Sequence, residues 1–194
     1  MTKIALFASG SGSNVQAIAE AVAAGQVPAE IALLVCDKPD AYVLQRAEAF
    51  DIPAFSFQPK QYESKEAFES EIVARLQAAG VEFIFLAGYM RLIGPVLLSA
   101  YRNRIVNIHP SLLPAFPGKD AIGQAFDAGV KISGVTVHFV DEGMDTGAII
   151  DQECVRIEEG MTCEGLQEAI QHIEHSLYPN MITKLLNGNR EEQN

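Results

Sequence analysis

The chain has 194 residues, 48% of them hydrophobic, and is long enough to bury a sizeable core as one globular domain. Its 25 acidic residues outnumber 14 basic ones, and the net charge of -11 argues against a nucleic-acid partner or an anionic membrane surface. The first residues lack the features of a signal peptide, and no apolar run approaches the roughly 20 residues of a membrane span. We therefore expect a cytoplasmic protein.

Strand-like runs alternate with helical patterns through most of the chain. Strands are predicted at 3–9, 30–36, 54–57, 83–88 and 104–109, and helices at 14–24, 40–50, 65–79, 94–101 and 119–128. Such alternation is typical of a parallel α/β sheet with right-handed crossovers. Two further strands, 132–140 and 148–157, are joined by a loop and not by a helix. A helix at 162–187 and a polar tail at 188–194 follow.

These elements predict a doubly wound, mostly parallel Rossmann-like α/β sheet with an antiparallel edge. The whole chain, residues 1–194, is expected to form a single domain. The three cysteines, Cys36, Cys154 and Cys163, have neither the number nor the spacing of a disulfide or zinc framework, and we interpret them as reduced.

The stretch "ASGSGSN", residues 8–14, lies between the first strand and the first helix. Unpaired backbone N–H groups and the helix dipole at such a turn favour a phosphate. The spacing and the lysine of a P-loop are missing, and a dinucleotide fingerprint would have a third glycine where Val15 stands, although Asp37 sits where a ribose-binding acid would. A monophosphate site remains, and simple capping of the helix by Ser13 or Asn14 is compatible with it.

The segment "NIHPSLLPAFPG", residues 107–118, follows the fifth predicted strand. Asn107 and His109 are two residues apart in a strand, so both side chains face the same side at the edge where α/β sheets bind ligands. The prolines stop the strand and stiffen the loop, in which Leu113–Pro114 is a candidate for a cis peptide bond.

A second polar loop, "DEGMDTGAI", begins at Asp141 and contains Asp145 between two glycines. Asp145 is placed to approach His109 from a neighbouring strand end, and a carboxylate beside an imidazole favours its protonated form. His138, in a strand with an alternating pattern, is interpreted as a buried hydrogen-bonding residue that supports the site. An isolated histidine is more often structural, and the nearby carboxylate is what favours a catalytic role here.

These motifs resemble the phosphoribosylglycinamide formyltransferases of purine synthesis, which use 10-formyltetrahydrofolate. The resemblance covers about residues 3–186 and rests on "GSGSN", "LAGYMRLI", "NIHPSLLPAFPG", "GVTVHFVDEGMDTGAII" and "EHSLYP". The asparagine, histidine and aspartate are shared by all folate-dependent formyltransferases, so they indicate the reaction class. The phosphate loop and the chain length indicate the substrate.

The resemblance implies a catalytic set of Asn107, His109 and Asp145. Asn107 and protonated His109 would donate hydrogen bonds to the oxyanion of a tetrahedral intermediate, while Asp145 holds His109 protonated and relays a proton. The N-terminal half would bind the ribonucleotide through Gly10, Ser11, Gly12, Ser13, Asn14 and, from the last helix, Glu174. The C-terminal half would be catalytic and bind the folate, through Lys65, Met90, Arg91, Leu92, Ile93, Asn107, Asp141, Glu142 and Asp145.

Several alternatives and departures accompany this hypothesis. Formyltetrahydrofolate hydrolase is the nearest alternative; a non-catalytic nucleotide-binding module and a dinucleotide oxidoreductase are the others. Lys119 and Asp120 follow "FPG" where some family members have a histidine at the second position, and Lys65 stands where others have an arginine.

Metals and partners complete the expectations. His172 and His175 are three apart on a helix, but two ligands at that spacing are common by chance, and formyl transfer needs no metal, so none is predicted. We expect small-molecule substrates as the partners and a monomer or homodimer as the assembly.

Overall fold

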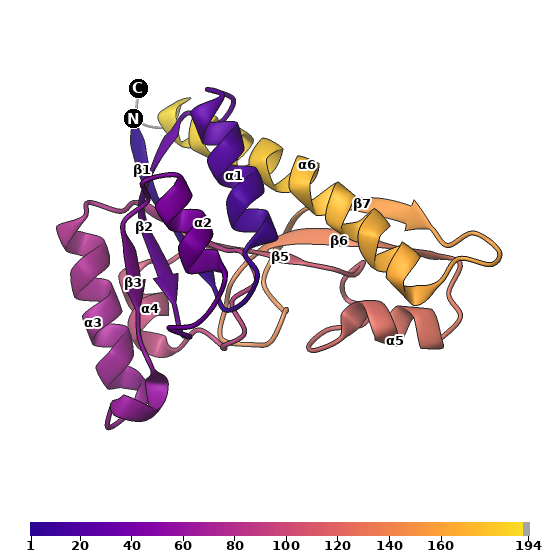
Figure 1. Cartoon of the computed structure of the whole chain (residues 1–194), viewed down its shortest axis with the longest axis horizontal. Helices are drawn as coiled ribbons and strands as arrows, with labels where there is room; N and C mark the ends of the chain where they lie inside the picture. Colours follow the sequence, from indigo (N-terminus) through magenta and orange to yellow (C-terminus); the bar gives the residue numbers. More distant parts are fainter. Residues whose placement is uncertain (192–194) are drawn as a thin grey trace.

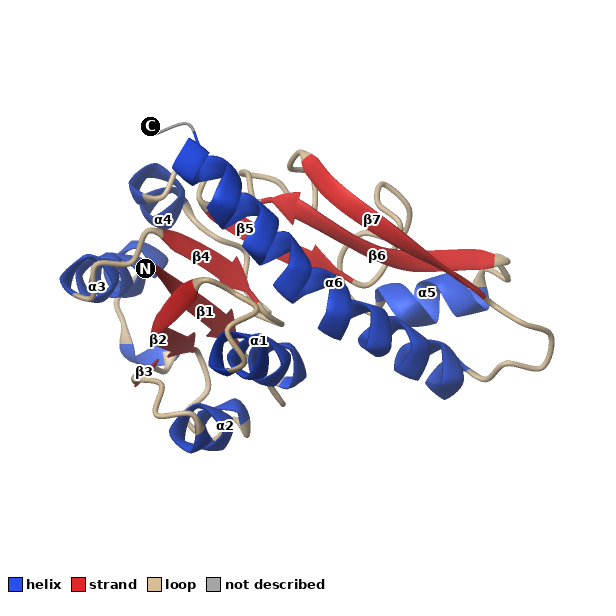
Figure 2. Ribbon diagram, turned by 90° about the horizontal axis from the view of Figure 1, so that it is seen from above, coloured by secondary structure: helices blue, strands red, loops and turns tan. Residues whose placement is uncertain are grey.

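The computed structural model describes residues 1–191, with side chains described through residue 188. Within this range the strands form one seven-stranded sheet in the order β3-β2-β1-β4-β5-β6-β7 (Figures 1 and 2). The five strands from β3 to β5 are parallel, and β6 and β7 are antiparallel to their neighbours. The predicted doubly wound sheet with an antiparallel edge is confirmed.

The elements follow the predicted alternation. The strands are β1 (Thr2–Ala8), β2 (Ala29–Cys36), β3 (Ala54–Ser56), β4 (Phe83–Leu86), β5 (Ile105–His109), β6 (Ile132–Phe139) and β7 (Ile149–Arg156). The helices are α1 (Ser13–Ala23), α2 (Val43–Ala49), α3 (Lys65–Ala78), α4 (Pro95–Ala100), α5 (Ala121–Asp127) and α6 (Cys163–Glu191), with a 3-10 turn, η1 (Pro59–Gln61). Helix α6 continues four residues into the predicted polar tail, and 192–194 lie outside the described residues.

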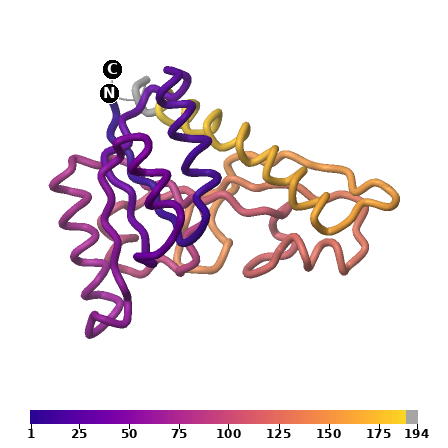
Figure 3. The backbone as a smooth tube through the Cα atoms, viewed as in Figure 1, coloured from indigo at the N-terminus to yellow at the C-terminus, as the bar shows by residue number. Residues whose placement is uncertain are grey.

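Two apolar layers cover the sheet. One face packs against α1, α2 and α6, and the other packs against α3 and α4. The central parallel strands β1 and β4 are buried on both faces, which is why they read as continuous apolar runs in the sequence. Figure 3 shows α6 running back along α1, against which it packs. No helix among the described residues is both long and apolar enough to cross a membrane.

Helix α6 is anchored in the sheet by Tyr178, whose side chain is fully buried. Its hydroxyl lies 2.9 Å from the carbonyl oxygen of Leu86 and 3.1 Å from that of Val106. These carbonyls belong to β4 and β5, so the hydroxyl ties the last helix to the two strands that lead into the site. Burial raises the pKa of Tyr178 well above its usual value, which keeps the hydroxyl a donor.

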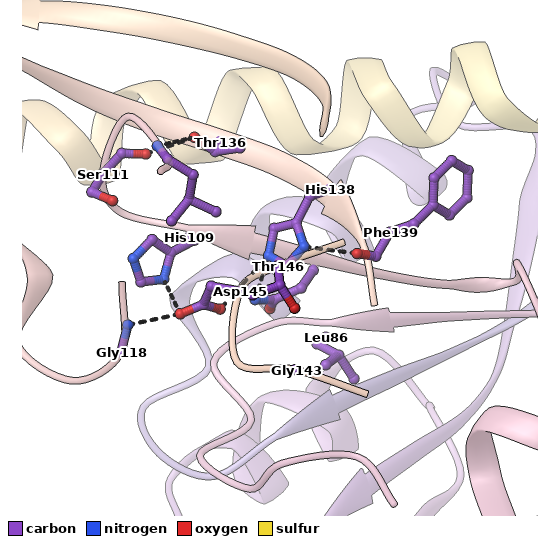
Figure 4. Close-up of polar contacts among 12 residues, drawn as sticks. Leu86, His109, Ser111, Gly118, Thr136, His138, Phe139, Gly143, Asp145 and Thr146 are labelled. Carbon is purple, nitrogen blue, oxygen red and sulfur yellow. Dashed lines mark hydrogen bonds and ion pairs between the residues drawn. The ribbon is translucent and has the colours of Figure 1, made fainter. Parts of the chain in front are cut away.

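The antiparallel strand β6 determines how the second polar loop reaches the site. Phe139, at its carboxyl end, pairs with Val106 near the start of β5, and His138 pairs with Asn107. The loop after β6 therefore has to turn back over β5 before β7 begins. This return path brings Asp145 to His109 (Figure 4).

Candidate active site

A first cavity, of about 220 Å³, opens at the turn between β1 and α1. Gly12 adopts a φ of 77°, and a Cβ there would clash with the Val43 side chain, so the turn requires glycine at this position. Strand order reverses at β1, which lies between β2 and β4, and ligands bind at such switch points. The cavity is lined by Ser9, Gly10, Ser11, Gly12, Ser13, Asn14, Lys38, Ala87, Gly88 and Met90.

Helix α1 begins without a capping side chain. Gly12 is the N-cap residue and no side chain caps the helix, so Ser13 and Asn14 are the first two helical residues. The alternative in which Ser13 or Asn14 caps α1 is therefore contradicted by the structure. Backbone N–H groups of the first turn stay available to an anion, because they have no partner within the helix. Lys38, which no motif marked in the sequence, adds a cation to this cavity.

Glu174 of α6 lies against the same turn. Asn14 Nδ2 donates to Glu174 Oε2 at 3.2 Å, and the glutamate is 8% exposed. Burial raises the pKa of Glu174 to about 7, and the hydrogen bond from Asn14 opposes this shift. Asn14 Oδ1 is buried and has no hydrogen-bond partner among the described residues. The carboxyl group of Glu174 thus contacts the first turn of α1, and the binding of a ribonucleotide there stays a prediction.

Asn107 is oriented by His138. His138 Nδ1 lies 2.8 Å from the carbonyl oxygen of Phe139, which can only accept, so Nδ1 carries the proton. Burial lowers the pKa of His138, and the neutral ring leaves Nε2 as an acceptor 3.2 Å from Asn107 Nδ2. In the part of the chain that is described, this bond uses one of the two amide hydrogens of Asn107. His138 is thus a buried hydrogen-bonding residue, as expected, and its support of a functional site stays a prediction.

His109 and Asp145 form the centre of the site. His109 Nδ1 lies 3.4 Å from Asp145 Oδ2, and that oxygen also accepts the backbone N–H of Gly118 at 2.8 Å (Figure 4). Asp145 Oδ1 lies 3.7 Å from His138 Nε2. Asn107, His109 and Asp145 therefore converge, as the spacing of the motifs predicted. Asp145 has a φ of 56°, a left-handed conformation that aspartate tolerates better than most residues.

The ring of His109 has acceptors on both sides. Nε2 donates to the Phe116 carbonyl oxygen at 2.9 Å, while Nδ1 faces the Asp145 carboxylate. Only the doubly protonated imidazole can donate to both groups. The loop that supplies Phe116 contains a cis peptide bond at Leu113–Pro114, as proposed from the sequence. Neither ring nitrogen of His109 is free in this arrangement, so a direct bond to substrate requires one of the two contacts to be exchanged.

A second cavity, of about 550 Å³, lies between α4 and the loop after β6. Five of the residues predicted to bind the folate line it: Lys65, Leu92, Ile93, Asp141 and Glu142. It is also lined by Gly94, Pro95, Leu98, Ser99, Arg102, Asn103 and Val140. Arg102 and Asn103 follow α4 in an ordinary polar stretch, and no sequence signal pointed to them.

Two of the predicted folate-binding residues are directed elsewhere. Met90 lines the first cavity, and its backbone N–H donates to Ser9 Oγ at 2.9 Å. Arg91 Nε lies 2.7 Å from Asp37 Oδ2 in an ion pair whose carboxylate side chain is 2% exposed. Asp37 thus has a protein partner at the position where a ribose-binding acid was considered.

Asn107 and Asp145 are close in the chain or the sheet to residues that line the two cavities. Leu86 pairs with Asn107, and the next residues along the chain, Ala87 and Gly88, line the first cavity. On the other side, the loop that carries Asp145 begins with residues 140–142, which line the second cavity.

Of the two residues that follow "FPG", Asp120 has a structural role for its side chain, and nothing in the structure explains the lysine at 119. Asp120, where some family members have a histidine, is the N-cap residue of α5, and its side chain accepts the Gly123 N–H. The Lys119 carbonyl oxygen accepts from Gln124 Nε2 at 2.6 Å. Among the described residues, no three His, Cys, Asp or Glu side chains gather as a metal site requires, and the absence of a metal stays a prediction.

Comparisons with known proteins show the family of the chain. Residues 2–182 match the formyl transferase family. A phosphoribosylglycinamide formyltransferase of Bacillus subtilis is 57% identical over 194 residues, which cover 100% of both chains. The crystal structure of a glycinamide ribonucleotide transformylase from Geobacillus kaustophilus has 60% identity and a TM-score of 0.94, covering 96% of this chain and 99% of that one.

A more distant relative is the trifunctional purine biosynthetic protein adenosine-3 of Drosophila melanogaster. It is 42% identical over 188 residues, which are 96% of this chain and 14% of that protein. The hydrolase, oxidoreductase and non-catalytic alternatives receive no support from these relatives. The chain belongs to the formyl transferase family, and within it to the phosphoribosylglycinamide formyltransferases of purine biosynthesis.

Proposed function

We propose that the chain transfers a formyl group from 10-formyltetrahydrofolate to the amine of glycinamide ribonucleotide. The products are N-formylglycinamide ribonucleotide and tetrahydrofolate. The observation that carries this proposal is the convergence of Asn107, His109 and Asp145 close to residues that line two cavities. This arrangement supplies an amide donor, an imidazole and a carboxylate at one point.

The ribonucleotide binds in the first cavity. Its phosphate is held by the backbone N–H groups of the turn at residues 10–14 and by Lys38, which explains how an acidic protein holds an anion. Its amino end lies toward Glu174, whose raised pKa of about 7 falls once a positively charged amine is present. The carboxylate form then pairs with the amine and can accept its proton, because only the neutral amine attacks.

The formyl donor binds in the second cavity. Leu92, Ile93, Leu98 and Val140 supply apolar walls for an aromatic heterocycle, and the polar backbone of residues 141–142 offers hydrogen bonds at one end. Lys65 and Arg102 line the same cavity and suit the anionic glutamate tail. The volume of about 550 Å³ falls in the ordinary range of small-molecule sites.

Asn107 stabilises the developing oxyanion. Attack of the amine nitrogen on the formyl carbon produces a tetrahedral centre, and its oxygen gains negative charge. His138 accepts one amide hydrogen of Asn107 and so fixes the direction of the other, which donates to that oxygen. A donor aimed in advance needs no reorganisation when the charge appears.

His109 and Asp145 move the proton. The attacking amine must lose one proton, the folate N10 must gain one, and the bond between the formyl carbon and N10 then breaks. His109 lies between two acceptors, and exchange of one contact releases an N–H for the reacting atoms. Asp145, tied to the Gly118 N–H, stays in place to take up or return the proton.

A single assay tests the proposal. Purified protein is incubated with 10-formyltetrahydrofolate, with and without glycinamide ribonucleotide, and both products are measured. We expect tetrahydrofolate and formylated ribonucleotide to appear in equal amounts, and only when both substrates are present. Release of tetrahydrofolate that is independent of the ribonucleotide contradicts the proposal and indicates a hydrolase.

A further inference from the structure

One acidic side chain beside the second cavity is buried without lining it. Glu69 of α3 is 1% exposed, and the cavity wall is built from residues 92–95 and from α4, in front of it. Its Oε1 accepts the backbone N–H of Gly94 at 2.6 Å, and its Oε2 lies 3.4 Å from the backbone nitrogen of Leu97. A buried carboxylate is costly unless it is hydrogen-bonded, and these backbone groups are the partners it has.

Glu69 replaces the cap that α4 lacks. Gly94 is the N-cap residue of α4 and has no side chain, while Leu97 is the third residue of the helix, whose N–H a capping side chain would normally satisfy. The Glu69 carboxylate reaches both groups from a different helix. The beginning of α4, which supplies Pro95 and Leu98 to the cavity wall, is therefore fixed by α3.

The close approach depends on the glycine. A Cβ on Gly94 would lie 2.7 Å from Glu69 Oε2 and 2.9 Å from Lys65 Cε, both too short for normal contacts. Lys65, one turn before Glu69 on α3, donates its ammonium group to the Leu92 carbonyl oxygen. Helix α3 thus holds residues 92–94 at two points, one on each side of Ile93.

We propose that Glu69 is a positioning residue for the formyl donor: its buried carboxylate fixes the wall formed by Leu92 to Gly94 and the start of α4. This inference rests on the proposed function, since it assigns the second cavity to the folate. Lys65 contributes to the same support through Leu92. Glu69 is the more informative residue, because it does not line the cavity and can affect a ligand only through the wall.

The test is Glu69→Gln, with Glu71→Gln as the matched control on the same helix. Glutamine keeps the shape but has one acceptor oxygen, so its NH2 group would face one of the two backbone N–H groups. Glu71 is only partly buried and pairs with Arg75 and Tyr62 instead. Tetrahydrofolate binding is measured by calorimetry, and the Michaelis constant for each substrate is measured by product formation.

We expect Glu69→Gln to weaken tetrahydrofolate binding on the order of tenfold, as loss of a buried charge-assisted hydrogen bond does, with a parallel rise in the Michaelis constant for the formyl donor. The Michaelis constant for the ribonucleotide should change by less than about twofold, since the first cavity lies elsewhere. The control should match the wild type. If Glu69→Gln does not fold, Glu69→Asp, whose shorter side chain withdraws the carboxylate from the Gly94 and Leu97 N–H groups, should give the same selective loss.

Three results overturn the inference. Wild-type affinity in the folded Glu69→Gln variant shows that the wall does not need the carboxylate. Equal rises in both Michaelis constants show a general structural effect and not positioning. Wild-type protein that forms no product and binds no tetrahydrofolate refutes the proposed function itself, and this result is distinct from the first two.

Discussion

The orientation of the Asn107 amide is set by His138, its partner on the neighbouring strand. Burial lowers the pKa of His138, the bond from Nδ1 to the Phe139 carbonyl fixes its tautomer, and Nε2 is left to accept from Asn107. The sequence predicted Asn107 and His109 as a pair because two residues apart in a strand share a face. It did not predict the partners of either side chain, since these come from β6 and the loop before α5, far along the chain.

Replacing Asn107 with alanine removes this oriented donor. We expect turnover to fall on the order of 100-fold or more, because loss of one oxyanion donor costs about 2.7–4 kcal/mol. Steady-state kinetics with both substrates, together with a thermal unfolding curve to verify folding, measure the effect. Turnover near that of the wild type would make Asn107 a structural residue.

Glu174 gives the protein a pH-dependent stability. Its folded pKa of about 7 exceeds the ordinary value of 4.5, so the folded state binds the proton more tightly than the unfolded chain does. The resulting stability is complete below pH 4.5 and is lost as the pH rises through about 7. Its size is on the order of 3 kcal/mol at most, at about 1.36 kcal/mol per pKa unit.

Glu174→Gln should abolish this part of the pH dependence. Urea unfolding at pH 5 and pH 8 is measured for the wild type and the variant. The wild type should lose more stability between the two pH values than the variant, and equal losses would show that Glu174 titrates normally. The loss of stability in the variant is subtracted from the loss in the wild type, because other groups titrate in both proteins.

Among the elements, the loop between β4 and α4 is held from two sides. Helix α3 contacts it through Lys65 and Glu69, and the end of β2 contacts it through the pair of Asp37 with Arg91. The motif "LAGYMRLI" predicted that this loop belongs to the site. It did not predict that Arg91 would turn back to Asp37, because such a pairing depends on β2 and β4 lying on either side of β1.

The ion pair predicts unequal effects for its two partners. Asp37 is 2% exposed at its side chain, Arg91 is 41% exposed, and Asp37 Oδ1 has no hydrogen-bond partner among the described residues. Arg91→Ala leaves a buried carboxylate without its partner and should lower the free energy of unfolding by about 1–3 kcal/mol. Asp37→Asn removes the charge and should cost less. Chemical unfolding measures both, and the opposite order would contradict this account.

Across the whole molecule, alternation and apolar runs predicted the architecture well. Val35 and Phe85 are buried on opposite faces of the parallel sheet. Strands buried on both faces give continuous apolar runs, and these runs indicated a sheet covered on both sides. The helix ends were predicted within a few residues, and the 3-10 turn at Pro59–Gln61 was missed because its short polar sequence resembles a loop. Lys38 and Arg102 were missed because isolated cations on a surface carry no pattern.

The continuous sheet predicts cooperative unfolding. One sheet includes β1 to β7, and α6 packs against α1 as well as against β6 and β7, so neither half has a separate core (Figure 2). We expect near- and far-ultraviolet circular dichroism to report the same urea midpoint in a single transition. Two separate midpoints would mean that residues 1–194 do not form the single domain expected from the sequence.

The long helix α6 determines the direction in which Glu174 points. Glu174 contacts Asn14, and Tyr178, one turn later, is fastened to the carbonyls of Leu86 and Val106. A single residue inserted between Glu174 and Tyr178 would rotate Glu174 by about 100° around the helix axis if Tyr178 kept its hydrogen bonds. The four-residue spacing from Glu174 to Tyr178 therefore fixes the direction of Glu174 relative to the buried sheet. An insertion or deletion there is harder to accommodate than a change of side chain.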